Sequence, residues 1–145
     1  MSNVWFCSDL HLGHKNIGKF RAPLVNSTSE NTERIFSDWK KYVTKRDVVY
    51  ILGDFCFDRD LWGTVLDELT ADKIYLIRGN HDDKFTTNEL LEFFNEVYGL
   101  VRYKEFWLSH APIHSHELRG RVNVHGHVHY HTVNDPRYFN CCPIS

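Results

Sequence analysis

The chain has 145 residues, of which 42% are hydrophobic and 25% are charged, a composition typical of a globular protein with a single core. Its formal net charge of −2 excludes a general electrostatic attraction to nucleic acid, although it allows a local basic patch. No apolar run approaches the roughly 20 residues of a membrane helix, and no basic leader precedes the first apolar segment. Because the four cysteines form no CxxC pair, we expect reduced thiols in a cytoplasmic protein.

The first half of the chain alternates between predicted strands and predicted helices. Short apolar, β-branched segments predict strands at 3–7, 47–52 and 73–77. Apolar side chains that recur about every four residues predict helices at 27–43, 61–69 and 88–96. Beyond residue 97 the spacing changes and predicts further strands at 98–104, 105–109, 121–124 and 138–141. We therefore expect one α/β domain over residues 1–145, with a parallel sheet in its first half.

Side chains that can bind metal ions follow the predicted strands, at the points where the strands end. They are Asp9, His11, Asp54, Asn80, His110, His127 and His129. Loops at the carboxyl ends of parallel strands converge on one crevice in open α/β sheets. Oxygen and nitrogen donors without thiolate suit a first-row ion, and there are too many of them for one tetrahedral ion. The sequence therefore predicts two ions about 3.5–4 Å apart that share one carboxylate.

Glycines precede several of these ligands, at Gly53, Gly79 and Gly126. Glycine adopts backbone conformations that other residues avoid. We therefore expect sharp turns at these three positions, which would let the backbone approach the ions closely.

Five short motifs resemble those of the calcineurin-like metallophosphoesterase family, and they occur in the family's order. They are Asp9-Leu10-His11, Gly53-Asp54, Gly79-Asn80-His81-Asp82, Ser109-His110 and Gly126-His127-Val128-His129. The resemblance implies a minimal version of the family's αββα sandwich, in which helices flank two mixed sheets. It implies one ion held by Asp9, His11, Asp54 and His129. It implies a second ion held by Asp54, Asn80, His110 and His127. Asp54 is then the bridge, and a water or hydroxide shared by the two ions is the nucleophile.

The same resemblance implies roles for residues that bind no ion. His81 would contact the phosphate together with Asn80 and would protonate the leaving oxygen. Asp82 would orient His81 through a hydrogen bond. The segment from residue 6 to residue 17 is similar to the opening of compact, single-domain bacterial and phage members. This likeness places three further candidate substrate contacts beside the ions, at His14, Lys15 and Asn16.

Several residues also have a simpler structural interpretation. Asp9 and Asp54 would be turn acids or helix caps if they stood alone. Outside the motifs, His125 is expected to be a supporting residue and His131 a surface residue. His114 and His116 are expected to be exposed loop residues, with contact to the substrate as the alternative. Most aromatic residues fall at core spacing, and Phe55 and Phe57 are the exceptions that we consider as a platform for the substrate.

The function expected from this resemblance is metal-dependent hydrolysis of a phosphodiester, with a small nucleotide-like molecule as the substrate. Manganese is the expected ion, and iron, zinc, nickel and cobalt are the alternatives. A nuclease acting on DNA or RNA, a phosphomonoesterase or protein phosphatase, and a non-catalytic scaffold are the competing functions. The expected location is the cytoplasm of a bacterium or of a phage-infected cell, without membrane attachment.

Overall fold

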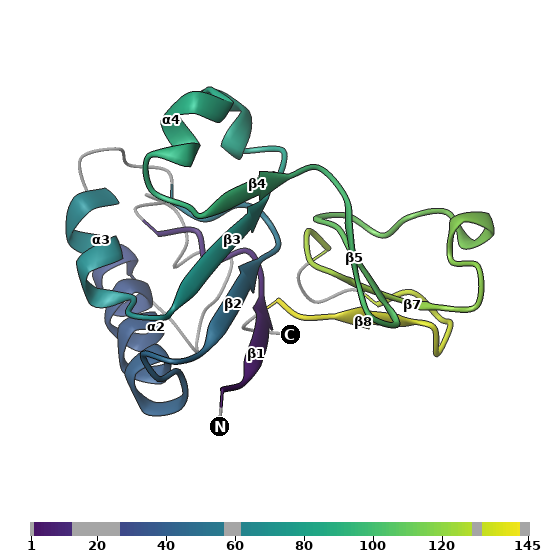
Figure 1. Cartoon of the computed structure of the whole chain (residues 1–145), viewed down its shortest axis with the longest axis horizontal. Helices are drawn as coiled ribbons and strands as arrows, with labels where there is room; N and C mark the ends of the chain where they lie inside the picture. Colours follow the sequence, from purple (N-terminus) through teal and green to yellow (C-terminus); the bar gives the residue numbers. More distant parts are fainter. Residues whose placement is uncertain (1, 13–26, 57–61, 129–131, 143–145) are drawn as a thin grey trace.

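Two four-stranded sheets face each other in the computed structural model, which describes residues 2–12, 27–56, 62–128 and 132–142 (Figure 1). The first sheet contains, in spatial order, β1 (Val4–Cys7), β2 (Val48–Ile51), β3 (Lys73–Ile77) and β4 (Glu96–Tyr98), and all its neighbours are parallel. The second sheet contains β5 (Val101–Tyr103), β6 (Phe106–Leu108), β7 (Val122–His125) and β8 (Tyr138–Asn140). In it β5 and β6 are antiparallel, and the other pairs are parallel.

Helices cover the side of the first sheet that faces away from the second sheet (Figure 1). They are α2 (Thr28–Tyr42), α3 (Trp62–Glu68) and α4 (Thr87–Leu91). The Ser27 side chain caps the start of α2 by accepting a hydrogen bond from the Glu30 amide. The buried side chains of Ile35 and Trp39 lie one turn apart on the face of α2 that packs on the sheet. In the described residues no helix has both the length and the apolarity that a membrane crossing requires.

The alternation of side chains along the strands produces two cores. Val49 and Ile51 of β2 point toward the helices, whereas Tyr50 and the following Leu52 point toward the second sheet. The inter-sheet core is built on Leu52, Ile77, Leu108 and Val124. Since β2 and β3 each contribute side chains to both cores, their nearly continuous apolar sequence is the one expected of parallel strands.

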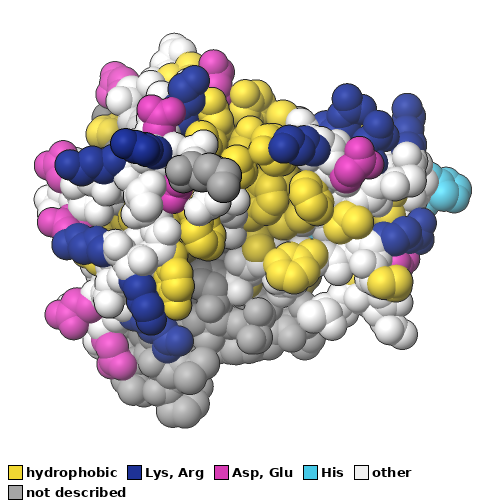
Figure 2. Space-filling view, turned by 60° about the horizontal axis from the view of Figure 1, so that its bottom comes forward, with side chains coloured by type: hydrophobic (Ala, Val, Ile, Leu, Met, Phe, Trp, Pro, Cys, Tyr) yellow, Lys and Arg dark blue, Asp and Glu magenta, His cyan; other side chains and the backbone are white. Residues whose placement is uncertain are grey.

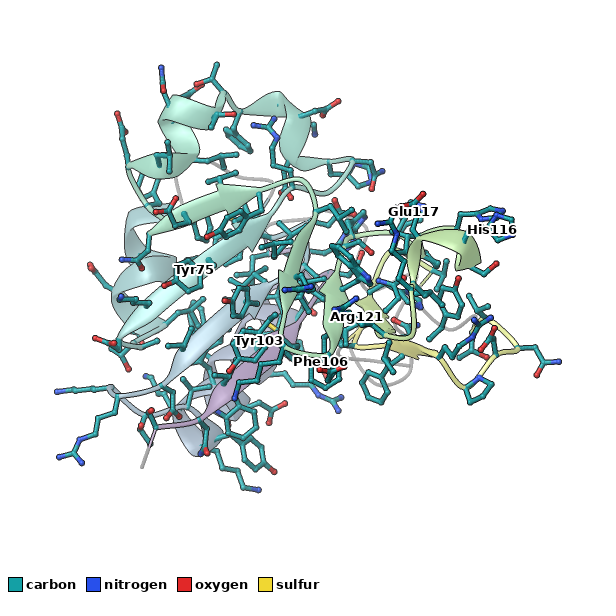
Figure 3. The ribbon with its side chains drawn as sticks, turned by 45° about the vertical axis from the view of Figure 1, so that its right-hand side comes forward. Tyr75, Tyr103, Phe106, His116, Glu117 and Arg121 are labelled. Carbon is teal, nitrogen blue, oxygen red and sulfur yellow. The ribbon has the colours of Figure 1, made fainter. Side chains whose placement is uncertain are left out.

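Aromatic rings close the inter-sheet core. The ring centroid of Phe6 in β1 lies 5.9 Å from that of Tyr50, 6.0 Å from that of Tyr103 and 5.7 Å from that of Phe106. Tyr103 and Phe106 lie close together at the turn between β5 and β6 (Figure 3). On the face of the molecule that Figure 2 shows, hydrophobic side chains gather in the middle and Lys and Arg side chains lie around them.

The predicted two-sheet α/β architecture is confirmed, and two details differ from the prediction. The helix predicted at 88–96 ends at Leu91, and Glu96 already begins β4. The strand predicted at 98–104 is divided between the two sheets, because the chain crosses from one sheet to the other at Gly99 and Leu100. The first sheet is parallel throughout, as the alternation of strands and helices predicted, whereas the family resemblance implied a mixed sheet.

The far side of the second sheet also differs from the αββα expectation. In the described part of the chain it is covered by the loop between β6 and β7, which contains the short 3-10 helix η3 (Ser115–Glu117). Trp107 and Tyr138 fix this loop by donating hydrogen bonds to the carbonyl oxygens of Leu118 and Ile113. This loop, held by the two hydrogen bonds, covers the face on which the αββα sandwich would have helices.

Candidate metal centre

The loops that follow β1 and β2 run side by side at the carboxyl end of the first sheet. The amides of Asp9 and His11 donate to the carbonyl oxygens of Gly53 and Asp54, each at 3.0 Å. The buried Asn31 of α2 donates from its side chain to the carbonyl oxygen of Leu10 at 3.0 Å. These bonds continue the pairing of the two strands beyond the sheet. They therefore deliver three metal-capable side chains to one place.

The ligand atoms form two groups that have Asp54 in common. One group is Asp9, His11 and Asp54, the other is Asp54, His110 and His127, and within each the ligand atoms lie within 4.8 Å of one another. The Oδ2 atom of Asp54 lies 3.7 Å from Nε2 of His11 and 3.3 Å from Nε2 of His110. A single carboxylate between two such groups is the arrangement expected of a bridging ligand.

His110 is oriented by its backbone surroundings. Its Nδ1 lies 2.8 Å from the carbonyl oxygen of Leu52, and an Nδ1–H that donates there leaves the lone pair on Nε2. That Nε2 lies 2.9 Å from Oδ1 of Asn80 and 3.1 Å from Nδ1 of His127. Asn80 therefore joins the second group with its amide oxygen.

Each buried carboxylate is anchored through one oxygen and presents the other to the histidines. Oδ2 of Asp9 accepts hydrogen bonds from the Ser8 hydroxyl at 2.6 Å and the His127 amide at 2.7 Å. Oδ1 of Asp9 faces Nε2 of His11 at 3.4 Å. Similarly, Oδ1 of Asp54 accepts from the His81 amide at 3.0 Å. The carboxylates are thus fixed in place before any ion arrives.

The electrostatics of the centre favour a cation. Burial acts to raise the pKa of Asp9, but hydrogen bonds from His11 and Ser8 outweigh it and hold this pKa at about 2. Burial also acts to raise the pKa of Asp54, and the interaction with His110 lowers it overall. Burial acts to lower the pKa of His110, yet the facing Asp54 raises it. Two carboxylates that stay ionised in the interior need positive charge beside them, so the donors present fit a pair of divalent ions.

Four of the expected ligands adopt left-handed backbone conformations, which non-glycine residues rarely adopt. Their φ angles are 56° for Asp9, 50° for His11, 52° for Asp54 and 70° for His127. Such strain persists only where the surroundings impose it, and it concentrates at functional sites. The strained backbone conformations of the centre therefore occur at the expected ligand residues themselves.

The three glycines that precede ligands serve in two different ways. Only Gly53 makes the expected left-handed turn, with φ of 91°. A Cβ atom at Gly79 would overlap Oδ1 of Asp54, and one at Gly126 would overlap the side chains of Ser8 and Asp9. The expectation of sharp turns is thus met at one position. At the other two, glycine is needed because another ligand loop packs directly against the backbone.

Asp82 connects the loop that follows β2 with the loop that follows β3. Its buried carboxylate accepts hydrogen bonds from the amides of Gly79 at 2.7 Å, Asp54 at 2.8 Å and Phe55 at 3.3 Å. These contacts are with backbone groups, whereas the sequence suggested an interaction with the His81 ring. The proximity of Asp82 to the centre was predicted, but its attachment to the preceding loops was not.

Of the remaining candidate residues, some lie beside the centre, some lie away from it, and some lie outside the described residues. The ring of His81 lies beside that of His11, with centroids 6.0 Å apart. Phe55 is 1% exposed and packs against Phe94, so the idea that it forms a substrate platform is wrong. His116 lies at the outer tip of the β6–β7 loop, away from the centre (Figure 3). The other candidates lie outside the described residues, namely His14, Lys15, Asn16, Phe57, His129 and His131.

The fold and the centre together define a metallophosphoesterase, and the comparison with known families agrees. The family model of the calcineurin-like phosphoesterases matches residues 2–141. The chain belongs to this family, and the membership indicated by the five motifs is confirmed.

Two relatives resemble the chain along most of its length, and neither name assigns a substrate. Over 146 residues the chain is 28% identical to an uncharacterized protein of Methanocaldococcus jannaschii, and the match covers 97% of this chain and 77% of that protein. Over 137 residues it is 31% identical to the Gene 66 protein of Mycobacterium phage L5, covering 91% of this chain and 60% of the phage protein.

Two solved structures share the fold. A protein of unknown function from Aquifex aeolicus superposes with a TM-score of 0.76 at 24% identity, covering 98% of this chain and 90% of that one. The nuclease MPE from Pseudomonas putida superposes with a TM-score of 0.56 at 23% identity, covering 86% of this chain and 59% of that one. These likenesses establish the architecture alone.

Proposed function

We propose that this protein is a hydrolase of phosphodiesters that depends on two divalent metal ions. The observation that carries the proposal is the position of Asp54, whose carboxylate belongs to both groups of ligand atoms. Asp9 and His11 would complete one site with Asp54, and Asn80, His110 and His127 would complete the other. His129 is proposed as the further ligand of the first site, and manganese as the ion.

When bound, the ions would supply positive charge for the phosphoryl oxygens and a water of lowered pKa as the nucleophile. The contributions of the chain itself follow from its geometry. Ser8 and the His127 amide hold Asp9 ionised, and the His81 amide holds Asp54. These fixed carboxylates need no reorganisation when charge develops on the substrate.

His81 is proposed as the acid that protonates the leaving oxygen. Its side chain is half-buried beside His11, and its backbone is attached to the bridging carboxylate. Asn80 is exposed and is proposed to contact the phosphate as well. His14, Lys15 and Asn16 are proposed as further contacts. Asp82 is proposed to act on His81 by fixing the loop from which His81 projects.

The first test is hydrolysis of bis(4-nitrophenyl) phosphate with Mn²⁺, with 4-nitrophenyl phosphate and a radiolabelled oligonucleotide assayed on the same sample. We expect turnover of the diester and loss of that turnover in Asp54→Asn, together with loss of bound manganese. Faster turnover of the monoester would refute the diester preference. Processing of the oligonucleotide with strong salt dependence would indicate a nuclease. No turnover with Mn²⁺, Fe²⁺, Co²⁺, Ni²⁺ or Zn²⁺ would refute the enzyme proposal.

The second test separates the acid from the ligands. His81→Ala should retain the manganese content of the parent protein while kcat falls on the order of 10²–10⁴-fold. The loss should be greater for a dinucleotide than for a 4-nitrophenyl ester, since a more basic leaving oxygen depends more on protonation. Loss of one equivalent of metal in this variant would instead make His81 a ligand.

A further inference from the structure

Arg78 donates hydrogen bonds to the segment that follows the proposed acid His81. This arginine comes directly after β3 and before Gly79, and its side chain is half-buried. Its Nη2 donates to the carbonyl oxygens of Asp82 at 3.2 Å and Phe85 at 2.8 Å, and its Nη1 donates to Oγ1 of Thr87 at 3.2 Å. All three acceptors lie within six residues after His81. The guanidinium therefore folds the chain back onto the end of its own strand.

The backbone of His81 is consequently fixed on both sides. Before it, the His81 amide donates to Oδ1 of Asp54 at 3.0 Å. After it, the Asp82 amide donates to the Gly79 carbonyl oxygen, and the Phe85 amide donates to the Asp82 carbonyl oxygen that Arg78 also binds. His81 itself has φ of −88° and ψ of −12°, an ordinary right-handed conformation, and lies directly before the short 3-10 helix η2 (Asp82–Lys84).

We propose that Arg78 is a positioning residue that sets the direction of the His81 imidazole by holding the segment 82–87. The inference rests on the proposed function, in which His81 acts on the substrate. The planar guanidinium suits this task because it donates several hydrogen bonds in fixed directions. A lysine keeps the charge but cannot reproduce that fork. Because both terminal nitrogens of Arg78 already donate to acceptors of the protein, the proposal assigns this residue to the loop and not to the phosphate.

The principal experiment is the variant Arg78→Lys, assayed with bis(4-nitrophenyl) phosphate and Mn²⁺. Misplacement of a catalytic group by about 1 Å costs on the order of 10²-fold, so we expect kcat to fall by about 10–100-fold with KM within about threefold of the parent value. Bound manganese should be unchanged. Arg102→Lys is the matched control, since Arg102 is exposed on β5 in the other sheet, and it should retain the parent kcat. A large rise in KM with unchanged kcat would make Arg78 a phosphate contact and overturn the inference.

A double-mutant cycle distinguishes positioning from general support of the fold. If Arg78 acts through His81, Arg78→Lys should add less than about a threefold loss in a His81→Ala background. Independent, multiplicative losses would overturn the inference.

Hydrogen exchange provides a reading that does not depend on turnover. In Arg78→Lys the Asp82 and Phe85 amides should exchange at least about tenfold faster than in the parent protein, whereas strand amides should not change. Unchanged exchange at these two amides would overturn the inference even if the enzyme is active. If the parent protein is inactive, the proposed function fails. The exchange rates of the Asp82 and Phe85 amides still test whether Arg78 holds the segment 82–87.

Discussion

The carboxylate of Asp82 should stabilise the fold through the two loops that it joins, and Asp82→Asn tests this. An asparagine oxygen can replace Oδ2 and accept from the Gly79 and Asp54 amides, but its NH₂ group then faces the Phe55 amide, which is a donor. Hydrogen bonds to charged groups contribute about 1.5–3 kcal/mol each. Since burial raises the pKa of Asp82, the neutral amide recovers part of the cost of burying a charge.

We therefore expect Asp82→Asn to lower the free energy of unfolding by about 1–2 kcal/mol, or Tm by about 3–8 °C for a chain of this size. The measurement is thermal unfolding in EDTA, so that metal binding does not enter. Asp83→Asn is the matched control, because its side chain is adjacent but exposed, and it should change stability by less than about 0.5 kcal/mol. Equal Tm values for the two variants would refute the reasoning about the loops.

Two further predictions concern glycine and acid. Gly126→Ala should displace the side chains of Ser8 and Asp9, so manganese affinity measured by calorimetry should fall at least about tenfold, whereas Gly99→Ala, with open space around it, should leave it unchanged. Asp47 accepts hydrogen bonds from the backbone amides of residues 44 and 3, and these bonds lower its pKa from 3.8 to about 2. A lowered pKa gives stability that is present above pH 3.8 and lost as the pH falls toward 2. The Tm deficit of Asp47→Asn should therefore be largest near neutral pH and shrink between pH 4 and 2, and a deficit independent of pH would contradict this assignment.

The position of the centre could be predicted because it depends on few rules. Apolar segments indicated β1, β2 and β3, and a metal-capable residue after each strand indicated which edge of the sheet would carry the site. What the sequence could not show was the crossing between sheets at Gly99 and Leu100, since the apolar pattern of residues 97–103 continues through it. The end of α4 was also missed. A capping box formed by Thr86 and Glu89 marks its start, whereas no comparable signal marks its end at Leu91.

The contacts behind the proposed ligands were less predictable than the position of the centre. An aspartate in a loop has the same sequence signature whether it binds a neighbouring ring or three distant amides, so the role of Asp82 required the structure. The strained backbone was assigned to glycines by the usual rule. In the structure Asp54 and His127 adopt it themselves, each next to a glycine. Only tertiary contacts reveal such conformations, because the residue type alone argues against them.

The left-handed conformation of Asp9, His11, Asp54 and His127 sets backbone strain against the contacts that their side chains make. At each of these positions glycine would relieve backbone strain, and it would also remove a donor atom from the centre. At Asp9 and Asp54 a glycine would also leave the His127 and His81 amides without their acceptors, and the cost of about 1–3 kcal/mol for each buried donor offsets the relief of strain.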